Sequence, residues 1–206
     1  VRFCNESTPY DFLCFQAGQQ PGGVWCEIFD ANAPEDILRF DTMGCSGFAK
    51  QMMAAGMPLE EFVAASKDAG ILKKADTLEE LADQLGFEGE AKEAFLEQVE
   101  RYNAQFDAQT DDDFGKEAYR LSALRTAPFY GLWFGGTLLT TLDGLKIDEE
   151  CRVLDAKNEP IQGFYAAGDV SGSFFSGNYP EYIVGVASGR SSVQGRHVAR
   201  KLAGDL

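Results

Sequence analysis

The sequence predicts an α+β fold in which a mostly helical middle is flanked by β-rich ends. Between Pro58 and Tyr102, apolar residues recur at the 3.6-residue spacing of amphipathic helices. The runs 24–29, 129–134 and 151–164 are instead short, apolar or aromatic, and bounded by turn residues, as strands are. A hydrophobic content of 45% over 206 residues is typical of a globular protein with one large or two small domains.

The N-terminal part of the chain is expected to contain one strand and two short helices. The turn signal Gly22-Gly23 precedes the strand, Val24–Phe29. Short helices are expected at 34–40 and 48–55.

Three amphipathic helices are expected in the middle of the chain. The first follows Pro58, which suits a first helical turn, and stops at Gly70. The second begins at the capping box Thr77–Glu80 and ends before Gly86. The third is longer, and four residues make its apolar face: Ala91, Phe95, Val99 and Tyr102.

A change in composition near Pro128 predicts a domain boundary. The expected domains are residues 1–127 and residues 128–206. Just beyond the boundary, residues 129–134 form a near-continuous apolar and aromatic run that ends in Gly135-Gly136.

The C-terminal part is expected to contain two hairpins and a helix. The first hairpin, 138–147, turns at Asp143-Gly144, and the second, 151–164, turns at Asn158-Glu159-Pro160. The helix runs from about Ile183 to Ala203, and its small residues allow close approach to a cofactor or a sheet.

The chain is strongly acidic, with a net charge of −15 and a pI near 4.4. This charge argues against a nucleic-acid partner and disfavours anionic membrane surfaces, because no basic stripe is present to neutralise phosphates. No apolar run approaches the roughly 20 residues that a membrane-spanning helix needs.

No metal site is expected. The five cysteines show no CxxC spacing, and the single histidine, His197, is interpreted as a surface or packing residue. The acidic run Asp111–Asp113 lacks the alternating ligands and the glycine of a calcium loop. We therefore interpret it as a solvated loop.

The stretch Gln162–Arg190 is the strongest functional signal. An apolar run ends at Gly168-Asp169, a glycine- and serine-rich loop follows, and the loop ends at Tyr179 ahead of a small-residue helix. Such an arrangement suits a nucleotide-type cofactor, because glycine admits close backbone approach, a carboxylate accepts from a hydroxyl group and a helix start offers N–H groups. The competing interpretation is a turn with an Asx cap.

The first residues, Val1-Arg2-Phe3, read as the middle of a longer sequence. We interpret the chain as a piece of a longer bacterial protein. The compartment stays open between cytoplasm and export, since a signal peptide would precede this piece.

Several segments, in the same order, resemble the C-terminal half of the fumarate reductase and 3-ketosteroid dehydrogenase flavoprotein superfamily. The matching segments are RFCNES-PYDF (2–12), KKADTLEELADQLG (73–86), VERYNAQFDAQTDDDFGKE (99–117), APFYGLWFGGTLLT (127–140) and CRVLDAKNEPIQGFYAAGDVSG (151–172).

The resemblance implies a mostly helical capping domain over residues 1–127 and the β-rich C-terminal segment of an FAD-binding domain over residues 128–206. The half with the GxGxxG fingerprint would be a partner, contributed by the rest of the parent protein. FAD is the implied cofactor of the full-length protein.

Specific cofactor contacts follow from the resemblance. Gly168 and Asp169 would contact the ribitol and phosphate region of FAD. Backbone N–H groups of a helix start at Ile183, Val184 and Gly185 would face the flavin and stabilise its anionic reduced form.

Departures from the family separate its branches. Where fumarate reductases carry arginines that donate a proton and clamp a carboxylate, this chain has Tyr10 and Tyr179. Where they carry a histidine before Gly-Gly, it has Leu132, Trp133 and Phe134. Losing these groups would leave substrate carboxylates unpaired, which costs several kcal/mol. Fumarate is therefore a disfavoured substrate.

The two tyrosines resemble the ketosteroid dehydrogenase pattern, in which one is a general base and the other donates to the substrate ketone. The match loosens at Glu181 and Tyr182, where that family has glycines. The expected activity is an FAD-dependent oxidation or reduction of CH–CH and C=C bonds next to a carbonyl, with an unspecified electron donor. Four aromatic residues are expected to line the substrate pocket: Trp133, Phe134, Phe174 and Phe175.

Two alternatives stay open. One is a dicarboxylate reductase of the fumarate type that uses residues outside this chain. The other is a catalytically silent, folded piece whose C-terminal segment exposes an apolar face and self-associates.

Overall fold

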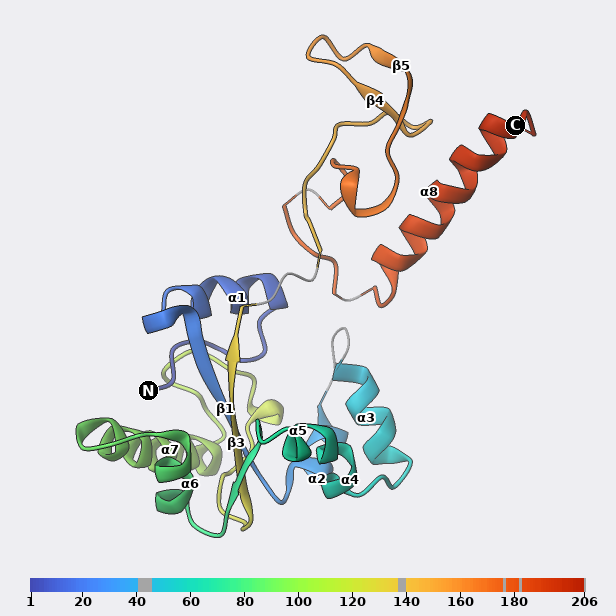
Figure 1. The fold of residues 1–206 in the computed structure, drawn as a ribbon. Coiled ribbons are helices and arrows are strands. Elements are labelled where there is room, and N and C mark those ends of the chain that lie inside the picture. Colours follow the sequence, from blue (N-terminus) through green and yellow to red (C-terminus); the bar gives the residue numbers. More distant parts are fainter. Residues whose placement is uncertain (41–45, 137–139, 176, 182, 206) are drawn as a thin grey trace. The chain divides into compact units, whose positions relative to one another are not determined.

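The computed structural model describes residues 1–206 apart from 41–45, 137–139, 176, 182 and 206 (Figure 1). The fold is α+β, as the sequence predicts. Contacts divide the chain into two compact units, Val1–Gly136 and Thr137–Leu206. The division falls after Gly136 and not near Pro128, because the strand that follows Pro128 pairs with strands of the first unit.

The first unit contains a three-stranded antiparallel sheet in the order β1-β3-β2. The strands are β1 (Val24–Asp30), β2 (Lys73–Ala75) and β3 (Phe129–Gly135). Seven helices belong to the described part of this unit: α1 (Tyr10–Gly18), α2 (Ala33–Arg39), α3 (Ser46–Ala54), α4 (Leu59–Phe62), α5 (Ala64–Asp68), α6 (Leu78–Leu85) and α7 (Glu90–Ala108).

Local signals in the sequence produced several of these elements as expected. The hydroxyl oxygen of Thr77 accepts from the N–H of Glu80 at 3.1 Å, so Thr77 caps the start of α6 at the predicted position. Gly86 then ends α6 in the left-handed conformation. On α7, Phe95 and Val99 of the predicted apolar face are buried.

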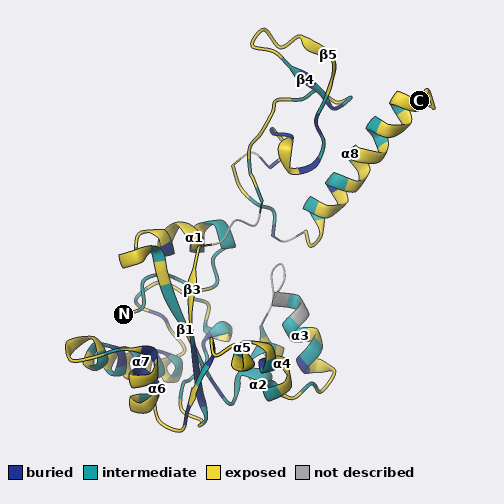
Figure 2. Ribbon diagram, viewed as in Figure 1, coloured by how far each residue is buried: buried dark blue, intermediate teal, exposed yellow. Residues whose placement is uncertain are grey.

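Each face of the sheet is covered by a different set of helices. Phe129 packs with Leu81 and Leu85 of α6 on one face. Tyr130, the next residue, packs with Val63 on the other face. Consecutive residues of β3 therefore belong to opposite layers, and the first three residues of β3 are buried (Figure 2).

The expected single helix from Pro58 to Gly70 is instead two short helices, α4 and α5. The backbone leaves the helical conformation at Val63, where φ is −93° and ψ is 1°. Val63 is β-branched, which disfavours a helix interior, and it packs with Leu72 and Tyr130 in the core.

A buried ion pair ties the N-terminus to the loop after α7. The Arg2 guanidinium donates to both carboxylate oxygens of Asp111, each at 2.8 Å. The Arg2 side chain is 8% exposed and that of Asp111 is fully buried. The rings of Tyr102 and Phe114 lie 5.0 and 5.1 Å from the guanidinium.

This pair corrects the interpretation of Asp111 as part of a solvated loop, whereas its neighbour Asp112 is exposed. Burial raises the pKa of Asp111, but hydrogen bonds from Arg2 and from the backbone N–H groups of Lys116 and Phe114 outweigh it and hold the pKa below its ordinary value. The carboxylate is an internal anchor of the first unit.

The second unit contains a β-hairpin and a long helix. The hairpin pairs β4 (Arg152–Leu154) with β5 (Pro160–Tyr165) through a turn at Asn158, as predicted. The helix α8 (Val186–Ala203) begins three residues later than predicted, because Gly185 adopts a φ of 81° and is its N-cap.

The other predicted hairpin, 138–147, is not formed in its described part, residues 140–147. This segment pairs instead with the turn after β5: Leu145 donates to Val170 at 2.9 Å and accepts from Gly172 at 2.8 Å. Gly144 and Gly172 permit this close pairing. A Cβ on Gly144 would lie 2.5 Å from the carbonyl oxygen of Val170, and a Cβ on Gly172 would lie 2.6 Å from that of Gly144. Residues 138 and 139 lie outside the described residues.

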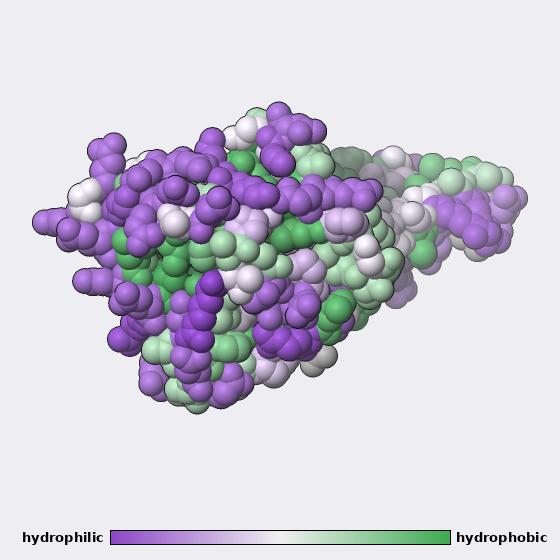
Figure 3. Space-filling model, turned by 90° about the horizontal axis from the view of Figure 1, so that it is seen from below, coloured by the Kyte–Doolittle hydropathy of each residue, from purple (hydrophilic) through white to green (hydrophobic). Residues whose placement is uncertain are grey.

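The described residues contain no helix that is both long and apolar enough to cross a membrane. Hydrophilic side chains cover much of the face shown in Figure 3, with hydrophobic areas between them.

Replacement of Asp111 by asparagine is expected to lower the free energy of unfolding by about 2 kcal/mol, because the buried Arg2 guanidinium then loses the charge of Asp111 and keeps only its ion pair with Glu6. Because the folded-state pKa of Asp111 is lowered, the stabilisation is present above about pH 4, the ordinary Asp pKa, and is lost as the pH falls toward the folded-state value. Urea denaturation across pH measures both effects. Asp112→Asn, at the exposed neighbour, is the control; equal losses for the two variants would contradict the prediction.

Candidate functional site

The predicted cofactor residues Gly168 and Asp169 lie in a short 3-10 turn, Gly168–Val170, just after β5. Gly168 has a φ of +73°, and a Cβ there would approach the Ser191 hydroxyl oxygen of α8 to 3.0 Å. Its N–H donates to the Gln194 side chain at 2.9 Å. Glycine at this position therefore lets the turn lie directly against α8.

Arg190 of α8 reaches the same turn from inside the unit. Its guanidinium donates to the carbonyl oxygen of Gly168 and, at 3.4 Å, to that of Ser171. The Arg190 side chain is 2% exposed, whereas that of Asp169 is 51% exposed, with 3.8 Å between the charged groups. The Asp169 carboxylate is thus available to accept hydrogen bonds from a ligand.

Aromatic rings connect Arg190 to Tyr179. The guanidinium lies over the rings of Phe174 and Phe175, at 4.9 and 4.7 Å from their centroids. The Phe175 ring then contacts the Tyr179 ring, with 5.3 Å between centroids. One buried side chain therefore contacts both the predicted cofactor turn and the loop that carries Tyr179.

Three other predicted site residues belong to the first unit. Tyr10 is the first residue of α1 and is half-buried. Trp133 donates its indole N–H to the carbonyl oxygen of Leu85 at 3.0 Å, on the α6 face of the sheet. Phe134 stacks on Trp25, its partner on β1, at 5.6 Å. Trp133 and Phe134 thus face opposite sides of β3 and do not line a common wall.

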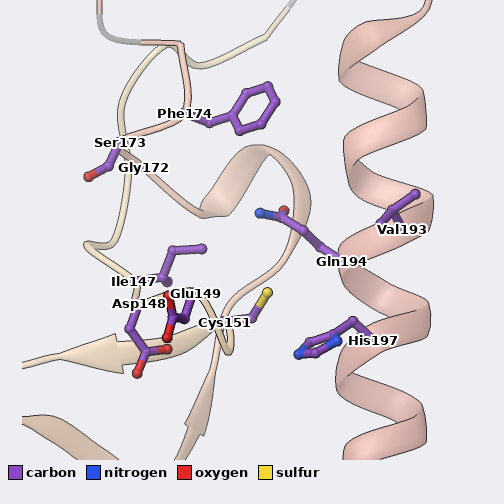
Figure 4. Close-up of a pocket in the computed structure, with 10 residues that line it drawn as sticks. All are labelled: Ile147, Asp148, Glu149, Cys151, Gly172, Ser173, Phe174, Val193, Gln194 and His197. Carbon is purple, nitrogen blue, oxygen red and sulfur yellow. The ribbon is translucent and has the colours of Figure 1, made fainter.

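A cavity of about 370 Å³ lies within the second unit (Figure 4). Its lining comes from α8, the segment before β4 and the loop after the 3-10 turn, and consists of Ile147, Asp148, Glu149, Cys151, Gly172, Ser173, Phe174, Val193, Gln194 and His197. Asp148 pairs with Arg152 at 2.6 Å, and His197 lies 3.3 Å from Glu150. Asp148 and His197 of the lining are therefore each paired with a residue outside it. Phe174 is the one predicted site residue that lines the cavity.

The FAD binding domain family matches this chain over residues 2–182. The chain belongs to this family. The match confirms the resemblance to fumarate reductase and 3-ketosteroid dehydrogenase flavoproteins, and FAD is the cofactor of the family, as the sequence predicted.

Two relatives and one solved structure show how much of such a protein this chain represents. NADH:acrylate oxidoreductase of Vibrio harveyi is 41% identical over 109 residues, which cover 53% of this chain and 10% of that protein. Vinyl phenol reductase of Lactiplantibacillus plantarum is 35% identical over 148 residues, which cover 69% of this chain and 29% of that protein.

The solved structure is that of 3-ketosteroid delta1-dehydrogenase from Sterolibacterium denitrificans in complex with 1,4-androstadiene-3,17-dione. It is similar to this chain with a TM-score of 0.68 at 25% identity, over 100% of this chain and 37% of that one. This chain therefore spans less than two fifths of each of these three proteins.

The residues around the start of α8 fit one side of an FAD molecule. No side-chain hydrogen bond caps this helix, and a Cβ on Gly185 would meet nothing within 4 Å. Ile183 and Val184 beside it are 62% and 73% exposed. Uncapped N–H groups and exposed apolar side chains suit the polar edge and the apolar face of a flavin.

Two predicted backbone contacts are less suited to FAD than the sequence suggested. The N–H of Ile183 donates to the carbonyl oxygen of Pro180 at 3.1 Å, in the turn before α8. The N–H of Gly168 already donates to Gln194. The Asp169 carboxylate and Gly185 are therefore the best-placed candidates among the predicted cofactor residues.

Sequence reasoning missed Arg190 and Gln194, which hold the turn predicted to contact the cofactor. One available signal was the composition of the segment Gly185–Arg190, in which a single charged residue follows five small or apolar ones. A single charged residue in an otherwise small and apolar helical segment indicates a buried charge, and a buried charge needs a partner.

Gly168→Ala is expected to destabilise the protein by about 2–4 kcal/mol, because it adds left-handed backbone strain of about 1 kcal/mol and a clash with Ser191. Gly163→Ala is the matched control, since Gly163 has a similar φ of +72° but open space around its Cβ position. Urea denaturation of both variants separates strain from packing. Equal losses would show that the turn does not need its close contact with α8.

Proposed function

We propose that this chain is the substrate-contacting part of an FAD-dependent oxidoreductase that acts on C=C or CH–CH bonds next to a carbonyl group. The observation that supports it best is the chain of contacts from the Gly168–Asp169 turn through Arg190 and Phe175 to Tyr179. It brings a tyrosine hydroxyl and the cofactor turn into one small unit.

The names of the relatives support the reaction class. Acrylate contains a C=C bond conjugated to a carboxylate, and 1,4-androstadiene-3,17-dione contains C=C bonds conjugated to a ketone. Vinyl phenol contains a C=C bond conjugated to an aromatic ring. The feature common to these compounds is an activated C=C bond.

Each tyrosine has one role in the proposed reaction. The Tyr179 hydroxyl donates a hydrogen bond to the substrate carbonyl oxygen and stabilises the negative charge that develops there. The Tyr10 hydroxyl exchanges a proton with the carbon next to the carbonyl, as a general acid or base. FAD, when bound, supplies or takes up the hydride at the other carbon.

Apolar surroundings in the second unit favour an apolar or aromatic substrate. Phe174 is 50% exposed beside the buried Phe175, and the two rings meet edge to face at 5.1 Å. Trp133 and Phe134, at 43% and 36% exposed, add apolar surface in the first unit. We assign the primary role in substrate contact to the loop of the second unit that contains Phe174 and Phe175, called the aromatic loop below.

A dicarboxylate substrate of the fumarate type is the second candidate. A carboxylate needs an accessible cation for tight binding. Arg190 is connected to Tyr179 through the Phe175 ring, and its guanidinium is buried against carbonyl groups and rings. A fumarate site would therefore need cations from other parts of the protein.

Tyr10→Phe and Tyr179→Phe, made in the full FAD-loaded protein, are each expected to lower turnover of an accepted enone by about 100-fold or more, the usual contribution of general acid–base or oxyanion groups. Steady-state kinetics with an enone, acrylate and fumarate in parallel measure it. Retained flavin absorbance verifies that the variants are loaded.

Wild-type enone turnover in both variants would refute the mechanism. Rapid oxidation of the reduced protein by fumarate, with no reaction of the enone, would favour the dicarboxylate alternative.

The 206-residue chain purified by itself is expected to be colourless, because it offers contacts to only one side of FAD. A visible spectrum and size-exclusion chromatography test this expectation. A yellow, monomeric chain would show that it holds FAD alone. A colourless, self-associated chain would agree with the exposed apolar residues of the second unit, which include Val170, Phe174, Ile183 and Val184.

A further inference from the structure

We propose that Arg190 is a positioning residue that fixes Tyr179 relative to the Gly168–Asp169 turn. The inference rests on the proposed function, since it assigns to Arg190 the task of holding the carbonyl-binding tyrosine in place. Arg190 itself touches neither substrate nor reacting atoms in this scheme.

The burial of Arg190 requires an explanation. A buried guanidinium is costly unless charge and hydrogen bonds compensate it. The nearest paired carboxylate, that of Asp169, lies 3.8 Å away and is half-exposed. The Nε atom has no hydrogen-bond partner among the described residues. Compensation comes instead from carbonyl oxygens and from two aromatic faces.

The hydrogen bonds and the ring contacts of Arg190 are made with two different segments, the predicted cofactor turn and the loop that contains Phe174 and Phe175. The N–H groups hold the carbonyl oxygens of Gly168 and Ser171, in the cofactor turn. The flat face of the guanidinium lies against the rings of Phe174 and Phe175. A planar group can make both contacts at once, and a lysine ammonium cannot.

The position of Tyr179 follows from that of Phe175. Their rings are 5.3 Å apart, and the N–H of Asn178 donates to the carbonyl oxygen of Phe175 at 3.1 Å within the same loop. A shift of Phe175 on the guanidinium is therefore transmitted to the tyrosine ring. Misplacement of a catalytic group by about 1 Å can reduce the rate by about 100-fold.

The cofactor turn has a second contact with α8 that does not involve Arg190. The side chain of Gln194 accepts from the N–H of Gly168 at 2.9 Å and lies 3.3 Å from the Ser171 hydroxyl. Loss of Arg190 is thus expected to displace the aromatic loop more than the turn. FAD binding and tyrosine positioning should respond differently to its substitution.

The test is a double-mutant cycle in the full FAD-loaded protein. Arg190→Met removes the hydrogen bonds and the planar cation while keeping an apolar side chain of moderate size. We expect it to lower kcat/KM for the enone by about 100-fold in the wild-type background. In the Tyr179→Phe background the further loss should be less than about 3-fold, because there is no hydroxyl left to position.

Two further variants make the result specific. Arg190→Lys keeps the charge and should restore little of the activity. Phe175→Leu leaves Arg190 in place but removes the ring between it and Tyr179, and should show the same non-additivity with Tyr179→Phe. Arg196→Met, at an exposed arginine of the same helix, is the control for loss of a positive charge. Flavin absorbance and thermal unfolding report whether each variant retains FAD and folds.

The outcomes separate this inference from the proposed function. If Tyr179→Phe retains wild-type turnover, the proposed function is wrong and the inference falls with it. If Tyr179→Phe is slow but Arg190→Met is not, only the inference is wrong. Equal losses from Arg190→Met in both backgrounds would also overturn it. If Arg190→Met fails to fold, Arg190→Lys takes its place in the cycle with Tyr179→Phe, and equal losses from Arg190→Lys in both backgrounds would overturn the inference.

Discussion

The contact between the buried guanidinium of Arg190 and the carbonyl oxygen of Gly168 is the constraint on which the second unit depends. It draws the turn after β5 onto α8, and the left-handed backbone of Gly168 permits the approach. The same guanidinium supports the rings of Phe174 and Phe175. Because a guanidinium is planar and has five donors, it satisfies carbonyls at its edge and rings at its face together.

The first unit uses an arginine in a different way. Arg2 faces the rings of Tyr102 and Phe114, but its edge pairs with the Asp111 carboxylate and not with carbonyl groups. The charge of Arg2 is therefore neutralised by adjacent carboxylates, and that of Arg190 much less so, because Asp169 is half-exposed and 3.8 Å away. An incompletely neutralised cation beneath the predicted cofactor turn favours negative charge on groups bound nearby.

Sequence reasoning succeeded where the determining residues are close together in the chain. The capping box at Thr77, the Gly86 helix end and the turn at Asn158 each involve neighbouring residues. It failed where the partner is distant: Asp111 was assigned to solvent because Arg2 lies 109 residues away. Arg190 was missed for a related reason, since its partners are backbone carbonyls, which leave no residue pattern in a sequence.

The role proposed for Tyr179 depends on the charges of the side chains around it. A tyrosine hydroxyl supplies one hydrogen bond without a positive charge, which suits a neutral ketone oxygen better than a pair of carboxylates. Arg190, although close, is occupied by carbonyls and rings, and Lys201 further along α8 pairs with Glu150. Binding a dianion would require cations that these contacts do not leave available. In the proposed function, where the role of Tyr179 rests on the ketosteroid dehydrogenase pattern, these contacts would favour a neutral carbonyl substrate.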